Sequence, residues 1–176
     1  HFQIVHHDIW NFDLPTAPIL LDVETDQGTT PIVAQTTKQG LVYTFNRETG
    51  EPIWPIEEVP FPASIVPGEK LSTTQPIPTK PAPYDMQGLS LDTLVDFTPE
   101  IRAQAIAAVA EYQMGPLFNP PLHRDNPLGK ISAMICPSGA VNITHPSVAD
   151  PTTGILYVTS RSSCSARPLV SGEEAD

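Results

Sequence analysis

The residues best equipped for chemistry stand near the start of the chain, in the stretch HHDIWNFDLP at 6–15. Two adjacent histidines, Asp8, Asn11 and Asp13 surround one tryptophan there. A carboxylate can take up a proton or hold a cation, whereas an asparagine amide oxygen can ligate Ca²⁺ but has no useful basicity near neutral pH. Adjacent histidines on a strand point to opposite faces, so they do not readily chelate one ion together. The acids and the asparagine therefore remain the candidates.

Short β-strands are the elements that must position these side chains. Two β-rich runs at 31–37 and 41–45 are separated by Lys38-Gln-Gly40, which predicts a hairpin. The second run leads into Asn46-Arg-Glu-Thr-Gly50, where an Asx side chain can close a turn and the glycine can take a positive φ. The segment 150–154, Asp-Pro-Thr-Thr-Gly, has the same design. Two such turns are typical of repeated blades.

Proline is the compositional anomaly, with 21 of 176 residues and ten of them between Pro52 and Pro99. This density rules out a continuous helix or a central strand, so the stretch is expected to be a long loop. Apolar residues are spread through it, which favours an ordered excursion packed on a larger body. A disordered linker is the alternative.

One helix is expected at 98–114, because Thr98 can act as N-cap, Pro99 suits the first helical position, and Gly115-Pro116 provides a stop. Five residues share one face at helical spacing, and we expect that face to contact the core rather than a partner: Ile101, Ala105, Ala108, Val109 and Tyr112.

Charge and motifs exclude several classes of function. Twenty acidic and nine basic residues give a net charge of −11, which disfavours binding to nucleic acid and to anionic membranes. No stretch approaches the roughly 20 apolar residues of a membrane-spanning helix, and the first residues are expected to mark a cut rather than a natural start. GxSxG, Walker, GxGxxG and CxxC motifs are absent. Cys136 and Cys164 are expected to be core thiols, although their spacing permits a bridge.

Several collinear segments carry a resemblance to a known family: HFQIVHHDIWNFDLPTAPILLDV, PIVAQTTKQGLVYTFNRETGEPIWPIEE, VPGEKLSTTQPIPTKPAPYD, LVDFTPEIRAQA, GPLFNPP and DPTTGILYVTS. They resemble the pyrroloquinoline-quinone (PQQ)-dependent dehydrogenases, the quinoprotein propellers, of the membrane-bound glucose and quinate type. The resemblance implies an eight-bladed β-propeller of four-stranded antiparallel blades. The expected fold class is therefore mainly β, a fragment of about two to three blades with a long Pro-rich loop and one short α-helix.

The resemblance also assigns roles to individual residues. The family pattern H-x-D-x-W-D-x-D places its general base directly after the tryptophan, and this chain has Asn11 there, as a base-position residue or metal ligand. Asp13 shares strand parity with Asn11 and is the candidate replacement base, unless it and Asp8 only cap turns. Lys38, at the hairpin tip, is expected to contact the quinone and polarise its carbonyl, with an ordinary solvated lysine as the alternative. Asn142 is the candidate cofactor-binding asparagine, or else a turn former.

Two functional hypotheses follow from the resemblance. In the first, the chain is part of a dehydrogenase that oxidises a sugar or polyol by hydride transfer to PQQ, with Ca²⁺ or Mg²⁺ held mostly by ligands outside this chain. In the second, it is a non-catalytic propeller module or an inactive truncated fragment. The resemblance implies the periplasmic side of the inner membrane and ubiquinone as electron acceptor, while the net charge of −11 leads us to expect no nucleic-acid partner. The expected division is 1–54 (blade strands with the candidate site), 55–115 (Pro-rich excursion and helix), 116–170 (further blade strands) and a tail at 171–176.

Overall fold

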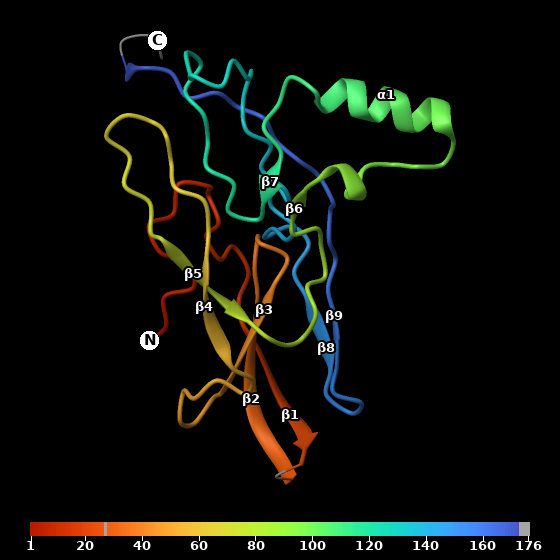
Figure 1. Cartoon of the computed structure of the whole chain (residues 1–176). Coiled ribbons are helices and arrows are strands. Elements are labelled where there is room, and N and C mark those ends of the chain that lie inside the picture. Colours follow the sequence, from red (N-terminus) through yellow and green to blue (C-terminus); the bar gives the residue numbers. More distant parts are fainter. Residues whose placement is uncertain (27, 173–176) are drawn as a thin grey trace.

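The computed structural model describes residues 1–26 and 28–172, and the fold is built from small antiparallel sheets (Figure 1). The largest sheet has the order β1-β2-β3, with β1 at Ile19–Thr25, β2 at Gly28–Thr36 and β3 at Val42–Asn46. Val33 pairs with Phe45, so the predicted hairpin around Lys38 is confirmed. The mainly β class is confirmed as well.

Three further sheets contain two strands each. Their strands are β4 (Ile56–Pro60) with β5 (Thr74–Pro78), β6 (Gly88–Leu89) with β7 (Gly115–Pro116), and β8 (Val148–Asp150) with β9 (Ile155–Tyr157). Sheets of two and three strands, each open at its edges, are consistent with part of a propeller.

The Pro-rich stretch is ordered, as expected, but it is not a loop throughout, because it contains β4 and β5. Pro76 lies opposite Glu58 and Pro78 opposite Ile56. Both strands of a two-stranded sheet are edge strands, so a proline without an N–H is tolerated there. Phe61 and Ile77 pack against the main core, which ties the excursion to the body.

The helix α1 spans Pro99–Val109, and its N-cap is confirmed because Thr98 Oγ1 accepts a hydrogen bond from the backbone N–H of Ile101 at 3.3 Å. The predicted extent of 98–114 is wrong, since the helix ends at Val109. A short 3₁₀ turn at Leu91–Thr93 precedes the helix.

The expected core face of this helix is also wrong. No residue of α1 is buried, and Ile101 remains 38% exposed. Figure 1 shows α1 extending away from the sheets. Alanines stand on every side of this helix, so it lacks a strongly apolar stripe that would hold it to a core. Among the described residues, no helix is long and apolar enough to cross a membrane.

The main core gathers residues from the N-terminal stretch, the β2–β3 hairpin and the segment after β7: Ile4, Trp10, Phe12, Leu41, Tyr43, Leu117 and Phe118. Phe118 makes edge contacts with the rings of Trp10 (5.1 Å between centroids) and Phe12 (5.6 Å). Such pairs add stability beyond the burial of their area. Trp10 is therefore a packing residue, and its indole N–H donates to Asn119 O at 2.8 Å.

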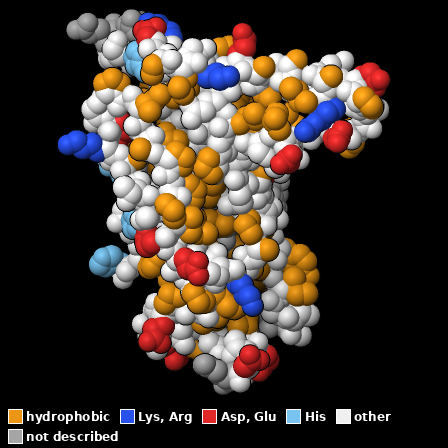
Figure 2. All heavy atoms as spheres, in the orientation of Figure 1, with side chains coloured by type: hydrophobic (Ala, Val, Ile, Leu, Met, Phe, Trp, Pro, Cys, Tyr) orange, Lys and Arg blue, Asp and Glu red, His pale blue; other side chains and the backbone are white. Residues whose placement is uncertain are grey.

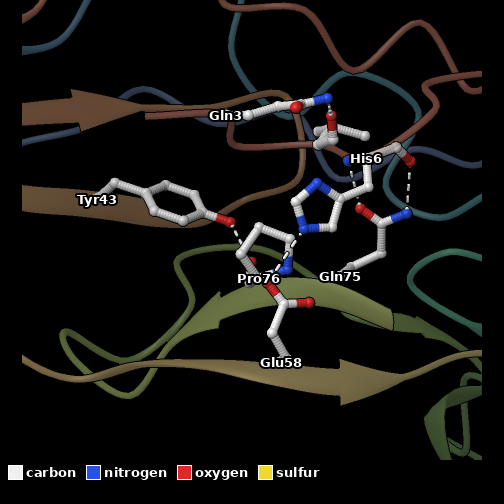
Figure 3. Close-up of polar contacts among 7 residues, drawn as sticks. Gln3, His6, Tyr43, Glu58, Gln75 and Pro76 are labelled. Carbon is white, nitrogen blue, oxygen red and sulfur yellow. Dashed lines mark hydrogen bonds and ion pairs between the residues drawn. The ribbon is translucent and has the colours of Figure 1, made fainter. Parts of the chain in front are cut away.

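The N-terminal stretch is tied to β4 and β5 by polar contacts (Figure 3). The buried Gln75 side chain exchanges two 2.8 Å hydrogen bonds with the backbone of His6, and the Tyr43 hydroxyl donates to Pro76 O at 2.7 Å. Burial raises the pKa of the Tyr43 phenol, so it stays protonated and donates. His6 contacts Glu58, whereas His7 contacts Glu69, so the two histidines have separate partners.

Acidic side chains lie at both ends of the face drawn in Figure 2, among others along its length. Figure 2 shows Asp and Glu side chains at the end of the β1–β2 hairpin and on the α1 arm, with hydrophobic side chains between these ends. Residues 173–176, most of the expected tail, lie outside the described residues.

Candidate functional site

A cavity of about 410 Å³ brings together three of the residues predicted from the sequence, Asn11, Lys38 and Asn142. They come from the N-terminal stretch, the β2–β3 turn and the loop that precedes β8. Its volume lies within the range of small-molecule sites. Asp13, the fourth predicted residue, does not line this cavity.

Asn11 is positioned by a tight turn. The Asp8 carboxylate accepts hydrogen bonds from the backbone N–H groups of Trp10 and Phe12, both at 2.8 Å. Between these two residues Asn11 adopts a φ of 62°, a left-handed conformation that asparagine tolerates better than most residues. The turn-capping alternative for Asp8 is therefore confirmed.

This turn overturns the strand argument for Asp13. Residues 8–15 do not form a strand, so residues two apart need not share a face. The Asp13 carboxylate instead accepts a short hydrogen bond from the Lys38 ammonium. Asp13 thus serves as the counter-ion of Lys38.

Lys38 is largely covered and paired with Asp13, unlike an ordinary solvated lysine. Its side chain is only 15% exposed. The turn that carries it is closed by hydrogen bonds from Thr37 N to Leu41 O and from Gly40 N to Thr37 O, both 3.1 Å. Gly40 has a φ of 77°, and a Cβ at this position would lie 2.8 Å from Asp85 Cβ. A larger residue would therefore displace the turn and its ammonium group.

The opposite side of the cavity is made of two chain segments, 135–142 and 160–169. Backbone hydrogen bonds join Ile135 to Ser165 in both directions, at 2.9 and 3.0 Å, and Ser138 N to Ser163 O at 2.7 Å. Cys136 and Cys164 form a disulfide between these segments, with 4.6 Å between their Cα atoms, so the expectation of two core thiols is wrong. Ala140 N donates to Lys38 O at 3.0 Å, which fastens this side to the hairpin turn.

Asn142 fits its turn-forming alternative. Its amide oxygen accepts a 2.9 Å hydrogen bond from Thr144 N and a further one from the Thr144 hydroxyl. Because this oxygen is occupied by the turn, only the amide N–H₂ group is left to donate to a molecule in the cavity.

The lining of the cavity is positively charged. Arg161 and Arg167 join Lys38 there, and none of the described lining residues is an Asp or Glu. Sequence reasoning missed both arginines, because no motif marks them. A compositional signal was present, since two of the nine basic residues of this acidic chain lie in SRSSCSAR at 160–167.

These residues do not fit a divalent cation. Ca²⁺ takes six to eight oxygen ligands, many of them carboxylates, and the cavity offers the Asn11 amide beside three cationic side chains. Among the described residues, no group of three or more His, Cys, Asp or Glu is placed to hold a metal ion. The predicted metal role of Asn11 thus has no support from this chain's own side chains.

The same residues do fit an anionic quinone such as PQQ, which is a tricarboxylic acid. Guanidinium and ammonium groups pair with carboxylates, while Ser163, Ser165 and the Asn142 N–H₂ group can donate hydrogen bonds. The chemistry of the donor set therefore favours an anion with several acceptor oxygens.

Comparisons with known proteins identify the family of the chain. The family model of the PQQ-dependent "glucose/ethanol/alcohol dehydrogenase, beta-propeller domain" matches residues 1–176. Over 77 residues, 43% of this chain, the sequence is 42% identical to the quinoprotein glucose dehydrogenase of Gluconobacter oxydans and 42% identical to a probable quinate dehydrogenase (quinone) of Xanthomonas campestris. It is 43% identical over 76 residues to the quinate/shikimate dehydrogenase (quinone) of Acinetobacter baylyi.

These matches cover about a tenth of each relative's length: 10% of the first two and 9% of the third. No solved structure matches the chain significantly.

Proposed function

The chain belongs to the PQQ-dependent glucose/ethanol/alcohol dehydrogenase β-propeller family, and from this premise we propose that it is part of a quinoprotein that oxidises a sugar or polyol by hydride transfer to PQQ. The substrate class comes from the resemblance and from the names of its relatives, which include glucose and glycerol dehydrogenases.

One observation carries the proposal: Asn11, Lys38 and Asn142, the residues to which the family resemblance assigns roles, line one cationic cavity. PQQ, when bound, supplies the quinone carbonyl that accepts the hydride and a negative charge that the cavity's cations can balance.

Lys38 has the geometry of a quinone-polarising residue. Its ammonium is largely covered and is held by Asp13, so it can present a fixed N–H to a developing oxyanion without reorganisation. Asp13 acts as a positioning residue, because its carboxylate orients the ammonium and balances its charge.

The side chain of Asn11 limits the proposed dehydrogenase activity, because it occupies the position of the family's general base. Its amide can hold the substrate hydroxyl by a hydrogen bond, but it cannot accept the alcohol proton. Because none of the described lining residues is a carboxylate, a non-catalytic propeller of the same descent is the second candidate function.

An Asn11→Asp variant distinguishes the two candidates. Both forms are loaded with PQQ and Ca²⁺, and reduction of an electron-accepting dye is followed with glucose, quinate and simple polyols. We expect the variant to gain at least about 100-fold in turnover, since a positioned base is worth about 10²–10⁴-fold. The matched control is Asn46→Asp, which adds the same charge in a turn away from the cavity.

The possible results of this experiment distinguish the two candidate functions. Turnover by the unmodified protein supports the dehydrogenase and assigns the base elsewhere. Turnover only in Asn11→Asp supports a dehydrogenase scaffold that has lost its base, which is the second candidate. Failure of both forms to bind PQQ would contradict the proposed function.

The proposal extends to partners and location. Ubiquinone as electron acceptor is supported by the word "quinone" in the names of two relatives, and the remaining blades would complete the propeller. The Cys136–Cys164 disulfide supports an oxidising compartment such as the periplasmic side of the inner membrane. Cell fractionation, with ubiquinone reduction assayed in the membrane fraction, tests both points.

A further inference from the structure

The α1 arm, defined as residues 91–111, carries a cluster of exposed apolar side chains. Five of them lie between residues 91 and 106, with these exposed fractions: Leu91 (46%), Val95 (40%), Phe97 (85%), Ile101 (38%) and Ile106 (40%). Figure 2 shows hydrophobic side chains gathered on the arm, with charged side chains beside them. Single exposed hydrophobic residues are ordinary, whereas a group of them on one projecting element is typical of an interaction surface.

A cleft of about 580 Å³ adjoins the arm, and its lining includes four large apolar side chains: Met86, Leu89, Leu91 and Met114. Leu91 belongs to both, so the cleft and the exposed apolar residues form one surface. The backbones of β6 and β7 are in close contact at the cleft, where a Cβ on Gly88 would lie 2.4 Å from Gly115 O. Methionine side chains adapt their shape to a partner, so this cleft suits an apolar side chain from another molecule.

Negative charge accompanies the apolar residues of the arm. Four acidic residues lie on it, all exposed: Asp92, Asp96, Glu100 and Glu111. None of the four has an ion-pair partner among the described residues. Arg102 is the only basic residue of the arm, and its guanidinium donates to Leu94 O at 3.1 Å. Three of the acids directly adjoin an exposed apolar residue in the sequence, in the pairs Leu91-Asp92, Asp96-Phe97 and Glu100-Ile101.

These charges indicate what covers the surface. A second copy of the chain would bring the same four acids and a net charge of −11, and like charges across an interface are unfavourable. Anionic membranes are disfavoured for the same reason. A helix with an apolar face and flanking Lys or Arg side chains can bury the exposed hydrophobic residues and pair with the acids at the same time.

We propose that the α1 arm and the adjoining cleft form a docking surface for a basic amphipathic helix of another protein. The apolar face of that helix contacts Phe97 and Ile101 and enters the cleft beside Leu91, while its Lys and Arg side chains pair with Asp92 and Asp96. The described residues that line the cleft are all different from those that line the cationic cavity. The inference therefore goes beyond the proposed function and does not depend on it.

Fluorescence anisotropy of a labelled peptide tests the proposal on the whole chain. The probe is a helical peptide of about 14 leucine and lysine residues, with all leucines on one face. A peptide of the same composition with its leucines scattered around the helix controls for charge alone, and one with glutamate in place of lysine controls for apolar contact alone. We expect saturable binding of one peptide per chain for the probe and much weaker binding of both controls.

Variants of the chain locate the binding. Phe97→Ser should raise the Kd of the probe by about 10- to 100-fold, the size expected when a phenylalanine side chain is no longer buried on binding. Its matched control is Leu128→Ser, because Leu128 is 52% exposed and lies outside the arm and the cleft. Near-ultraviolet circular dichroism verifies that each variant is folded before titration.

A second pair of variants measures the contribution of charge. Asp92→Asn/Asp96→Asn should raise the Kd of the probe by about 3- to 10-fold, since exposed ion pairs contribute modestly. Glu48→Gln/Glu51→Gln removes two exposed acids of the Asn46 turn and should leave the Kd nearly unchanged.

Four results would overturn the inference. The first is binding of the scattered peptide as tightly as the probe, and the second is an equal Kd for Phe97→Ser and Leu128→Ser. The third is sedimentation of the unmodified chain as a dimer that Phe97→Ser converts to monomers, which would assign the surface to a second copy. The fourth is Phe97-dependent binding to phosphatidylglycerol vesicles without binding of the probe. None of these results bears on the PQQ titration, so the proposed function is decided separately.

Discussion

The two sides of the cavity are constructed by different means. The first side, residues 8–13 with the β2–β3 turn, lies on the aromatic core, where Phe118 is fully buried between Trp10 and Phe12. The second side, 135–142 with 160–169, contributes no buried residue to that aromatic cluster, although Cys136, Ala140 and Val141 are buried, and its two segments are joined by a disulfide and backbone hydrogen bonds. Packing positions Asn11 and Lys38, whereas cross-linking positions Asn142 and the arginines.

This difference implies that the two sides respond to different perturbations. The geometry of the first side depends on burial, so we expect it to be lost together with the core, in one cooperative unfolding transition. The second side is joined by one covalent bond and a few backbone hydrogen bonds, so we expect it to open by itself while the core persists.

The largest expected effect comes from Phe118→Ala, which breaks the packed side. Deleting a fully buried phenylalanine ring typically costs about 3–5 kcal/mol of unfolding free energy, through lost burial and the cavity left behind. Denaturation in guanidinium chloride measures it. Phe97→Ala is the control, because that ring is 85% exposed and its removal should cost far less. A loss below about 1 kcal/mol for Phe118→Ala would contradict a core-built first side.

Removing the disulfide perturbs the cross-linked side. In the Cys136→Ser/Cys164→Ser double variant we expect a loss of about 3 kcal/mol, since the bond closes a loop with a sequence separation of 28. Hydrogen exchange should quicken at the amides of Ser165 and Ser138, while the Phe12 amide, bonded to Asp8, keeps its protection.

A dithiol reductant supplies the control for this prediction. It should reproduce the exchange pattern in the unmodified protein and change nothing in the double variant. Equal acceleration on both sides of the cavity would show that they form one cooperative unit, against the comparison drawn above.

The packed side was the easier one to predict from sequence. The hairpin that carries Lys38 depends on residues a few positions apart, so its sequence signal is local, like those of the N-cap at Thr98 and the two Asx turns elsewhere in the chain. Lys38 was found at the hairpin tip through the family pattern. The left-handed turn at Asn11 was missed, because the two bonds to Asp8 override the extended conformation that strand parity assumed.

The cross-linked side was hardly predictable, because long-range contacts create it. Nothing in the spacing of Cys136 and Cys164 required a bridge, and without that bridge no rule places Arg161 beside Lys38. The prediction that one face of α1 contacts the core was wrong for the opposite reason. Its local signals predicted a helix correctly, but helical spacing of alanines gave no evidence about what the helix contacts.

A smaller effect is expected from Asp8→Asn, which tests the polar fastening of the packed side. One carboxylate oxygen becomes an N–H₂ group, so either Trp10 N or Phe12 N loses its acceptor, at a cost of about 1–2 kcal/mol. Denaturation measures the loss, and the exposed Asp96 supplies the control variant Asp96→Asn. If the two variants cost the same, the Asp8 bonds do not hold Asn11 in its turn.

The smallest effect concerns the two turns of one design, one in each half of the chain. Asn46 Oδ1 accepts from Glu48 N and Thr49 N, and Gly50 N donates to Asn46 O at 2.8 Å. In the second turn Asp150 takes the place of Asn46, with Thr152 N donating to Oδ1 at 2.8 Å and Gly154 N donating to Asp150 O at 2.9 Å. Geometry is shared, but only the second turn carries a titratable acceptor.

The Asp150 turn should therefore loosen in acid while the Asn46 turn does not. The hydrogen bond from Thr152 N, followed by that from the Thr153 hydroxyl, holds the pKa of the Asp150 carboxyl below its ordinary value. The stabilisation is fully present above that ordinary value of about 3.9 and is lost as pH falls through the lower, folded-state pKa. Nuclear magnetic resonance of the Thr152 amide should show this transition, the Thr49 amide should lack one of comparable size, and Asp150→Asn should abolish it. A Thr152 amide that titrates equally in Asp150→Asn would mean that another acid governs this turn, and that the difference between Asn46 and Asp150 has no consequence for its pH response.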